Sequence, residues 1–281
     1  VTDTKVKHRR QSVLLQATYL LAAGNLYVVT YKIYPSGIVH VNAKFTSTDM
    51  QAAETEVSEA TRMATFTPGS DAARKAASKL EVPRIGVRFR LPAQMNNVQY
   101  FGRGPEENYI DRNHGTMVGI YQTTADKMYF NYVRPQENGH HTDTRWLNLS
   151  PDKGNGLVIV ADSLIGFNAL RNSVEDFDSE EALPHPYQWN NFSPEEAANH
   201  DEKAARNVLR RMHHVNDVTP RDFVEVCVDM KQQGVGGYDS WGARPEPFHQ
   251  IPANREYNWG FTLVPVRSGS QATEAAKYDY R

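Results

Sequence analysis

Two adjacent glutamates, Glu106 and Glu107, are the residues whose type points most directly to chemistry. Glycoside hydrolysis uses two carboxyl groups, about 5 Å apart in retaining enzymes and about 6.5–9.5 Å apart in inverting ones. Neighbouring side chains in an extended loop point away from each other, so this pair is poorly placed for that reaction. The sequence therefore predicts no catalytic residue in this segment.

Two pairs of neighbouring histidines, His140 with His141 and His213 with His214, raise the question of a metal site. Adjacent residues on a strand face opposite sides of the sheet, and no further histidine or cysteine at ligand spacing completes either pair. We therefore expect no metal and no other cofactor. An aldose mutarotase would need an acid and a base beside its sugar, and the candidates for these roles are His140 or His141 with Glu137.

Residues 100–112 form a glycine-rich segment that is dense in polar residues. It is not a phosphate-binding loop, because that loop needs a lysine and a serine or threonine after its glycines, whereas a proline and two acids follow here. The residues alone favour a tight loop in which Asn108, Asp111 and Arg112 satisfy buried backbone groups.

A second glycine-rich segment, residues 234–245, contains Trp241. A tryptophan in such a loop either plugs the end of the fold or offers a flat apolar platform to a ligand. Because tryptophan is usually largely buried, the residues alone favour the plug, with the platform as the alternative.

Alternating apolar and polar residues predict the strands that must position these loops. Residues 39–45 alternate in this way, with one side facing a core and the other facing water. Residues 25–34 precede them across Pro35-Ser36-Gly37, which predicts a hairpin. Further strands are expected at residues 85–91, 156–160, 224–229 and 259–266.

Two segments favour helix. Ser193 followed by Pro194 and Glu196 resembles a helix start, which predicts a short surface helix running toward Arg211. Residues 71–80 are rich in alanine and lysine but follow a Pro-Gly-Ser turn, so helix and loop both stay open. Many strands without regular intervening helices predict an antiparallel all-β sandwich over residues 1–267, followed by a polar, disordered tail over residues 268–281.

Composition limits the partners. Lys+Arg 31 against Asp+Glu 33 gives a formal net charge of -2, which argues against binding to nucleic acid or to an anionic membrane surface. The longest apolar stretch, residues 13–23, is too short to span a membrane, so we expect a soluble protein, cytoplasmic or periplasmic. The single cysteine, Cys227, cannot form an internal disulfide and is expected to be buried. The start at Val1, without a methionine or a leader, suggests a fragment of a longer chain.

Three separated segments resemble, in order, the C-terminal domain of β-galactosidases of glycoside hydrolase family 2. They are residues 101–112, residues 132–139 with residues 144–147, and residues 236–241. The strands between them extend the resemblance from about residue 26 to about residue 266. The resemblance implies an antiparallel supersandwich with a galactose mutarotase-like fold, placed after a TIM-barrel catalytic domain that carries both catalytic glutamates.

The resemblance also implies a function. The chain would be a carbohydrate-binding accessory domain of an enzyme that hydrolyses terminal β-D-galactosides, and by itself it would be inactive. Trp241 becomes a substrate platform, with Asp239 and Ser240 beside it. The implied partners are the galactoside, the barrel of the parent chain and further copies in a homo-oligomer.

Two features depart from the family pattern. Tyr238 stands where family members often have an acid, and the family's segment that links this domain to the barrel is missing before Val1. In addition, the stretch between Met63 and Lys79 is longer than the usual connection and has no assigned purpose. Two other functions stay open, an aldose 1-epimerase (mutarotase) and a stand-alone carbohydrate-binding module.

Overall fold

The computed structural model describes residues 1–21, 24–47, 81–133, 136–177, 218–237 and 244–280. Within these residues eleven strands form one hydrogen-bonded sheet in which every pair is antiparallel, so the predicted all-β antiparallel class is confirmed. The strands are β1 (Asp3–Arg9), β2 (Ser12–Leu20), β3 (Leu26–Ile33), β4 (Val39–Thr46), β5 (Arg84–Pro92), β6 (Asn97–Gly104), β7 (Met117–Thr124), β8 (His141–Ser150), β9 (Gly156–Leu170), β10 (Phe223–Gln232) and β11 (Tyr257–Val266).

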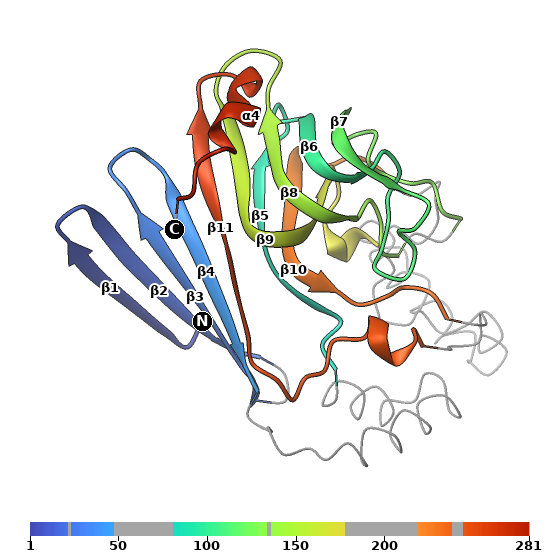
Figure 1. Ribbon diagram of the computed structural model, residues 1–281, viewed down its shortest axis with the longest axis horizontal. Coiled ribbons are helices and arrows are strands. Elements are labelled where there is room, and N and C mark those ends of the chain that lie inside the picture. The colour runs from blue at the N-terminus through green and yellow to red at the C-terminus, as the bar shows by residue number, and fades with distance from the viewer. Residues whose placement is uncertain (22–23, 48–80, 134–135, 178–217, 238–243, 281) are drawn as a thin grey trace, which may run out of the picture.

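The long strand β9 connects two layers. The main path runs β1-β2-β3-β4-β11-β9-β8-β6-β7, and β10 with β5 branches from it (Figure 1). The first part of β9 pairs with β11 and its last part with β10. The Tyr27 hydroxyl of β3 donates to the Gly86 carbonyl of β5 at 3.1 Å, which joins the branch to the main path. The larger of two apolar cores includes Val41, Phe261 and Val226.

The predicted hairpin is confirmed as β3 and β4. Gly37 has a φ of +84°, a value that favours glycine, and its N–H donates to the Tyr34 carbonyl at 3.0 Å. The other four predicted strands are also present, within β5, β9, β10 and β11. The expected helix after Ser193, residues 71–80 and the stretch between Met63 and Lys79 lie outside the described residues.

The alternation of residues 224–229 does not leave one face of β10 in water. Glu225, Cys227 and Asp229 are only 3%, 5% and 1% exposed. Arginines of the neighbouring strand β5 cover them, since Arg84 pairs with Asp229 at 2.6 Å and Arg90 pairs with Glu225 at 2.9 Å. Cys227 is buried as expected, and burial raises the pKa of its thiol to about 12.

The C-terminal segment differs from the disordered tail expected from the sequence. Residues 269–275 form a 3-10 turn, η6 (Gly269–Gln271), and a short helix, α4 (Ala272–Ala275). Ala272 is fully buried against a second apolar cluster that contains Trp146 and Val158. A one-turn helix needs only one small buried residue, so it leaves no periodic pattern in the sequence.

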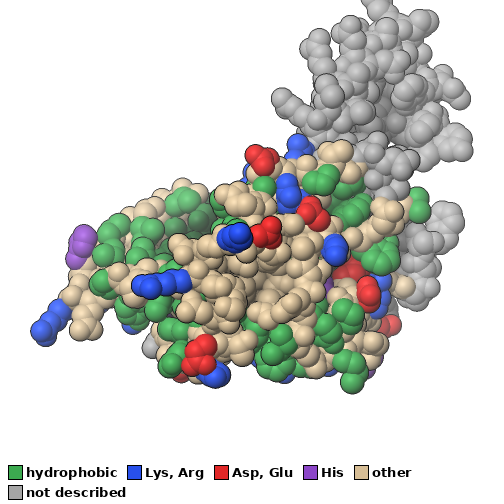
Figure 2. Space-filling model, turned by 90° about the horizontal axis from the view of Figure 1, so that it is seen from above, with side chains coloured by type: hydrophobic (Ala, Val, Ile, Leu, Met, Phe, Trp, Pro, Cys, Tyr) green, Lys and Arg blue, Asp and Glu red, His purple; other side chains and the backbone are tan. Residues whose placement is uncertain are grey.

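The main path of the sheet ends at β1 and β7, and the branch through β10 ends at β5. All seven residues of β1 are exposed, and β7 exposes Met117, Val118 and Ile120. On the face in Figure 2, positive and negative side chains are intermixed. No helix in the described part of the chain is long and apolar enough to cross a bilayer.

Candidate functional site

The three segments that carry the resemblance meet at one end of the sandwich. The Glu107 carboxylate accepts a hydrogen bond from the Gly139 N–H at 2.7 Å, which joins the first segment to the second. The Asp111 carboxylate accepts one from the Gly236 N–H at 2.7 Å, which joins the first segment to the third. Segments that are far apart in sequence therefore form one continuous surface.

Glu107 is the centre of this surface, although its side chain is only 5% exposed. Besides Gly139, it accepts hydrogen bonds from Arg112 at 2.6 Å, from the Tyr109 hydroxyl at 3.3 Å and from the Tyr132 hydroxyl. With both carboxylate oxygens engaged in holding two loops, Glu107 acts as a structural anchor.

Asn108 does what the sequence predicts of it. Its amide donates to the carbonyls of Arg103 at 3.1 Å and Glu106 at 3.0 Å, and its oxygen accepts from the Thr142 N–H at 3.0 Å. Asp111 likewise satisfies a backbone N–H. The prediction for Arg112 is wrong, because its guanidinium bonds the Glu107 and Tyr132 side chains instead of backbone groups.

His140 belongs to a buried polar cluster. It is 1% exposed, its Nδ1 lies 2.9 Å from the Asn168 oxygen, and Tyr109 stacks on its ring at 5.5 Å. Burial, with a smaller contribution from the charge of Arg84, lowers the pKa of His140 to about 3. The imidazole is therefore neutral in the folded protein at physiological pH.

This depressed pKa predicts that stability falls in mild acid. The unfolded chain takes up a proton on His140 below about pH 6.5, whereas the folded chain does so only near pH 3. Between pH 7.5 and 5.5 the loss from this residue is about 1.4 kcal/mol. Urea unfolding at both pH values measures it, and His140→Gln should show a smaller loss. An equal loss in the variant would contradict the assignment to His140.

His141 is also withdrawn from solvent. It is 2% exposed, its ring contacts Tyr100 at 4.8 Å and Phe167 at 5.2 Å, and burial lowers its pKa. Glu137 pairs with Arg84 at 3.8 Å and its side chain is 45% exposed, whereas both imidazoles are buried.

The stem of the glycine-rich loop, residues 234–237, is bonded to the protein on two sides. The Gly234 N–H donates to the His249 carbonyl at 2.8 Å, next to the 3-10 turn η5 (Pro247–His249), and Asp111 bonds Gly236 on the other side. Arg244, where the loop returns, forms an ion pair with Glu81. The predicted ligand contacts Trp241, Asp239 and Ser240 lie in residues 238–243, outside the described residues.

Comparison with known proteins identifies the family of the chain. The family described as "Beta galactosidase small chain" matches residues 1–263. The chain belongs to this family. It is 34% identical to a β-galactosidase of Priestia megaterium over 66% of this chain and 15% of that protein. It is 26% identical to a β-galactosidase of Lactobacillus delbrueckii subsp. bulgaricus over 94% of this chain and 20% of that protein.

The small-chain domain thus spans a fifth or less of the length of these relatives. Among solved structures, a galactose mutarotase related enzyme from Lactobacillus acidophilus is similar over 94% of this chain and 71% of its own, at 9% identity and a TM-score of 0.37. The match to the family begins at residue 1 and therefore includes the hairpin of β1 and β2. The resemblance described from the sequence begins only at about residue 26.

Sequence reasoning missed two exposed apolar side chains at the glycine-rich stem of this small-chain domain. Val235 lies within the stem and is 43% exposed, and Phe248, which is 72% exposed, precedes the His249 whose carbonyl accepts the Gly234 N–H. An isolated apolar residue in a loop has no periodicity to mark it as exposed, so no signal in the sequence could have found this surface.

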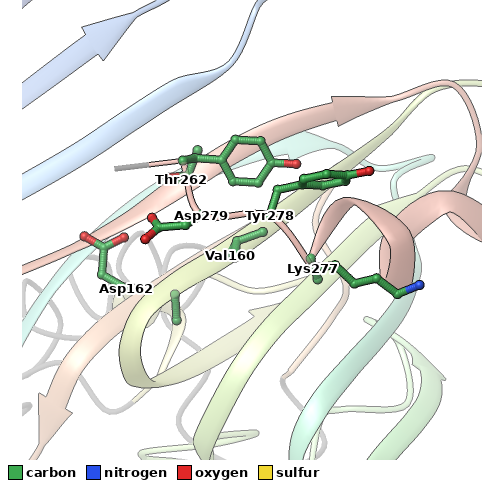
Figure 3. Close-up of a pocket in the computed structure, with 9 residues that line it drawn as sticks. Val160, Asp162, Thr262, Lys277, Tyr278 and Asp279 are labelled. Carbon is green, nitrogen blue, oxygen red and sulfur yellow. The ribbon is translucent and has the colours of Figure 1, made fainter.

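A shallow hollow lies elsewhere, between the C-terminal segment and the sheet (Figure 3). Its polar side chains have partners within the protein, because Asp162 pairs with His40 at 2.9 Å and Lys277 pairs with Glu274 at 2.6 Å. Over the described ranges, no three His, Cys, Asp or Glu side chains are grouped so as to hold a metal ion. The loop-bearing end therefore stays the candidate site.

Proposed function

We propose that this chain is a carbohydrate-binding accessory domain of a β-galactosidase that hydrolyses terminal β-D-galactosides, and that the catalytic glutamates lie outside it on a barrel. One observation carries the proposal. Glu107 and Asp111 tie the three family-like segments together at one end of the sandwich, so that the loop with Trp241 begins and ends there. In this role Trp241 is the platform for the sugar, with Asp239 and Ser240 as its polar neighbours.

The state of the carboxylates supports an accessory role. Hydrolysis needs one carboxyl group to donate a proton and a second to attack the sugar or to activate water. At this end of the sandwich, Glu107 accepts hydrogen bonds on both carboxylate oxygens and Asp111 accepts a backbone N–H, whereas Glu106 is exposed. Glu107 and Asp111 therefore support the loops, and we assign the acid and the nucleophile to the rest of the parent enzyme.

The epimerase alternative is less well supported. An acid or base must come within hydrogen-bond reach of its substrate. His140 and His141 are 1% and 2% exposed, and the ring of Tyr109 covers His140. A sugar could reach these imidazoles only after the loop of residues 103–112 had moved away.

We expect the isolated chain to show no turnover of p-nitrophenyl β-D-galactoside, while the full-length parent enzyme hydrolyses it. The chromogenic assay is run on the folded 281-residue chain, with circular dichroism to show that the sheet is present. Turnover that copurifies with the chain through every column would overturn the accessory role.

Calorimetric titration of lactose into the same chain separates the accessory domain from a stand-alone binding module. An accessory domain supplies only one wall of a shared site, so weak binding or none is expected. Saturable binding with a dissociation constant in the micromolar range would favour the stand-alone module.

A further inference from the structure

We propose that the hollow between the C-terminal segment and the sheet is a second carbohydrate site, in which one pyranose ring lies on the Tyr278 ring and its hydroxyl groups donate to the Asp162 carboxylate (Figure 3). The site shares no described residue with the loop-bearing end, so it does not depend on the function proposed above. The family match ends at residue 263, and the segment that forms one wall of the hollow follows that match.

The C-terminal segment is anchored on both sides of Tyr278. Ala272 is fully buried before it, and Tyr280 after it packs against the apolar cluster that contains Trp146. The Tyr280 hydroxyl also donates to the Ala275 carbonyl at 2.7 Å, which ties the end of the segment to α4. Tyr278 itself is 59% exposed, and its ring contacts the Tyr280 ring with 6.3 Å between the centroids. The hollow therefore has an accessible aromatic wall on a fixed backbone.

The sheet forms the other wall, and Asp162 of β9 is held there by two neighbours. Its Oδ2 lies 2.9 Å from His40 Nε2 on β4. Between these strands β11 presents Gly260, where a Cβ would lie 2.5 Å from the same oxygen, so a larger residue would displace the carboxylate. The contact with His40 engages one carboxylate oxygen and leaves the side chain 20% exposed. Asp162 is therefore an oriented acceptor at the surface of the hollow, and its pairing within the protein sets that orientation.

The charges around the hollow favour a neutral ligand that is rich in hydroxyl groups. Asp162 and Asp279 both line it, and the ammonium group of Lys277 pairs with Glu274 at 2.6 Å and points away in Figure 3. Carboxylates repel an anionic ligand such as phosphate, whereas hydroxyl groups donate short, charge-assisted hydrogen bonds to them. The apolar CH face of a pyranose in turn packs on an aromatic ring.

The size of the hollow limits the ligand to about one ring. Its volume is about 220 Å³. Pockets for drug-sized ligands measure about 300–1,000 Å³, so this one suits a smaller molecule. A site of this size with few polar contacts binds weakly, and we expect a dissociation constant in the millimolar range for a single sugar.

Titration of methyl β-D-galactopyranoside into the 281-residue chain, followed by amide chemical shifts, tests the site. The largest shifts should fall at residues 276–280 and at Asp162. Tyr278→Ala should weaken binding by about threefold to tenfold, whereas Tyr278→Phe keeps the ring and should bind as tightly as the unchanged chain. Asp162→Asn keeps an oxygen for His40 and should also bind more weakly, because the charged acceptor is lost. Tyr278 is exposed, so its truncation leaves no cavity and the melting temperature should hardly change.

Phe248→Ala is the matched control, because it removes an exposed ring at the loop-bearing end and should leave binding to the hollow unchanged. Tetramethylammonium, a cation without hydroxyl groups, should not displace the sugar. The second site is overturned if the sugar causes no shifts at residues 276–280, if Tyr278→Ala binds it as tightly as the unchanged chain, or if tetramethylammonium displaces it. None of these outcomes changes the expectation for turnover, so failure of the second site and failure of the accessory role are distinguishable.

Discussion

Asp229→Ala should lower the free energy of unfolding by about 3–5 kcal/mol, because it leaves a buried arginine without its carboxylate. Asp229 is 1% exposed, and its Oδ2 lies 2.6 Å from Arg84. The Arg84 side chain is 19% exposed and its Nε has no partner in the described structure. The guanidinium bonds Asp229 and Asn168, with Glu137 further away at 3.8 Å. Burial raises the pKa of the Asp229 carboxyl, and the Arg84 guanidinium beside it offsets part of that rise.

Urea unfolding of the 281-residue chain at pH 7.5 measures this loss, and Glu225→Ala is the matched control. Glu225 is a buried acid on the same strand, but its partners Arg88 and Arg90 have side chains 46% and 53% exposed. Those arginines can turn to water when the acid is removed, so the control should lose distinctly less stability. Equal losses in the two variants would show that burial of the partner arginine does not determine how much the free energy of unfolding falls.

Trp241→Ala in the full-length parent enzyme should raise KM about tenfold or more, with a smaller change in kcat. Stacking of a sugar on an indole contributes on the order of 1–3 kcal/mol of binding free energy. About 1.4 kcal/mol corresponds to a tenfold change in the dissociation constant. The loss falls mainly on KM if the ring binds substrate and transition state equally. An exposed platform leaves no cavity when it is removed, so the melting temperature should hardly change.

The same variant tests the plug that the residues alone favour. A tryptophan that closes the end of the sandwich would cost about 3–5 kcal/mol of stability on truncation, with near-normal KM in the enzyme that remains folded. KM and melting temperature are therefore measured on one preparation, with Trp241→Phe as the variant that keeps a smaller ring. A large drop in melting temperature with unchanged KM would reject the platform.

The strands could be predicted from the sequence because their alternation is local. Residues 39–45 become β4, and the turn at Gly37 makes it a hairpin with β3. The same pattern misleads at β10, where alternation implies water on one side. Glu225 and Asp229 instead meet arginines that enter from β5, and no local pattern reports which strand will become the neighbour.

The site could be predicted in part. The segments that form it stand out by composition, and the backbone contacts of Asn108 follow from its residue type. The contact between Asp111 and Gly236 joins residues 125 positions apart, so only the folded chain reveals it. The glycines of the stem look like turn residues in the sequence, yet Gly234 is needed because a carboxylate lies against it.

The two ends of the main path differ in how strongly they oppose the addition of a foreign strand. Outer strands carry unpaired backbone groups, and charged side chains on them discourage intermolecular pairing. β1 carries Lys5, Lys7 and Arg9 along its exposed length, whereas β7 has no charged residue and exposes Met117 and Ile120. Electrostatic repulsion therefore guards β1, and of these two strands β7 is the one more open to self-association into larger β-structures.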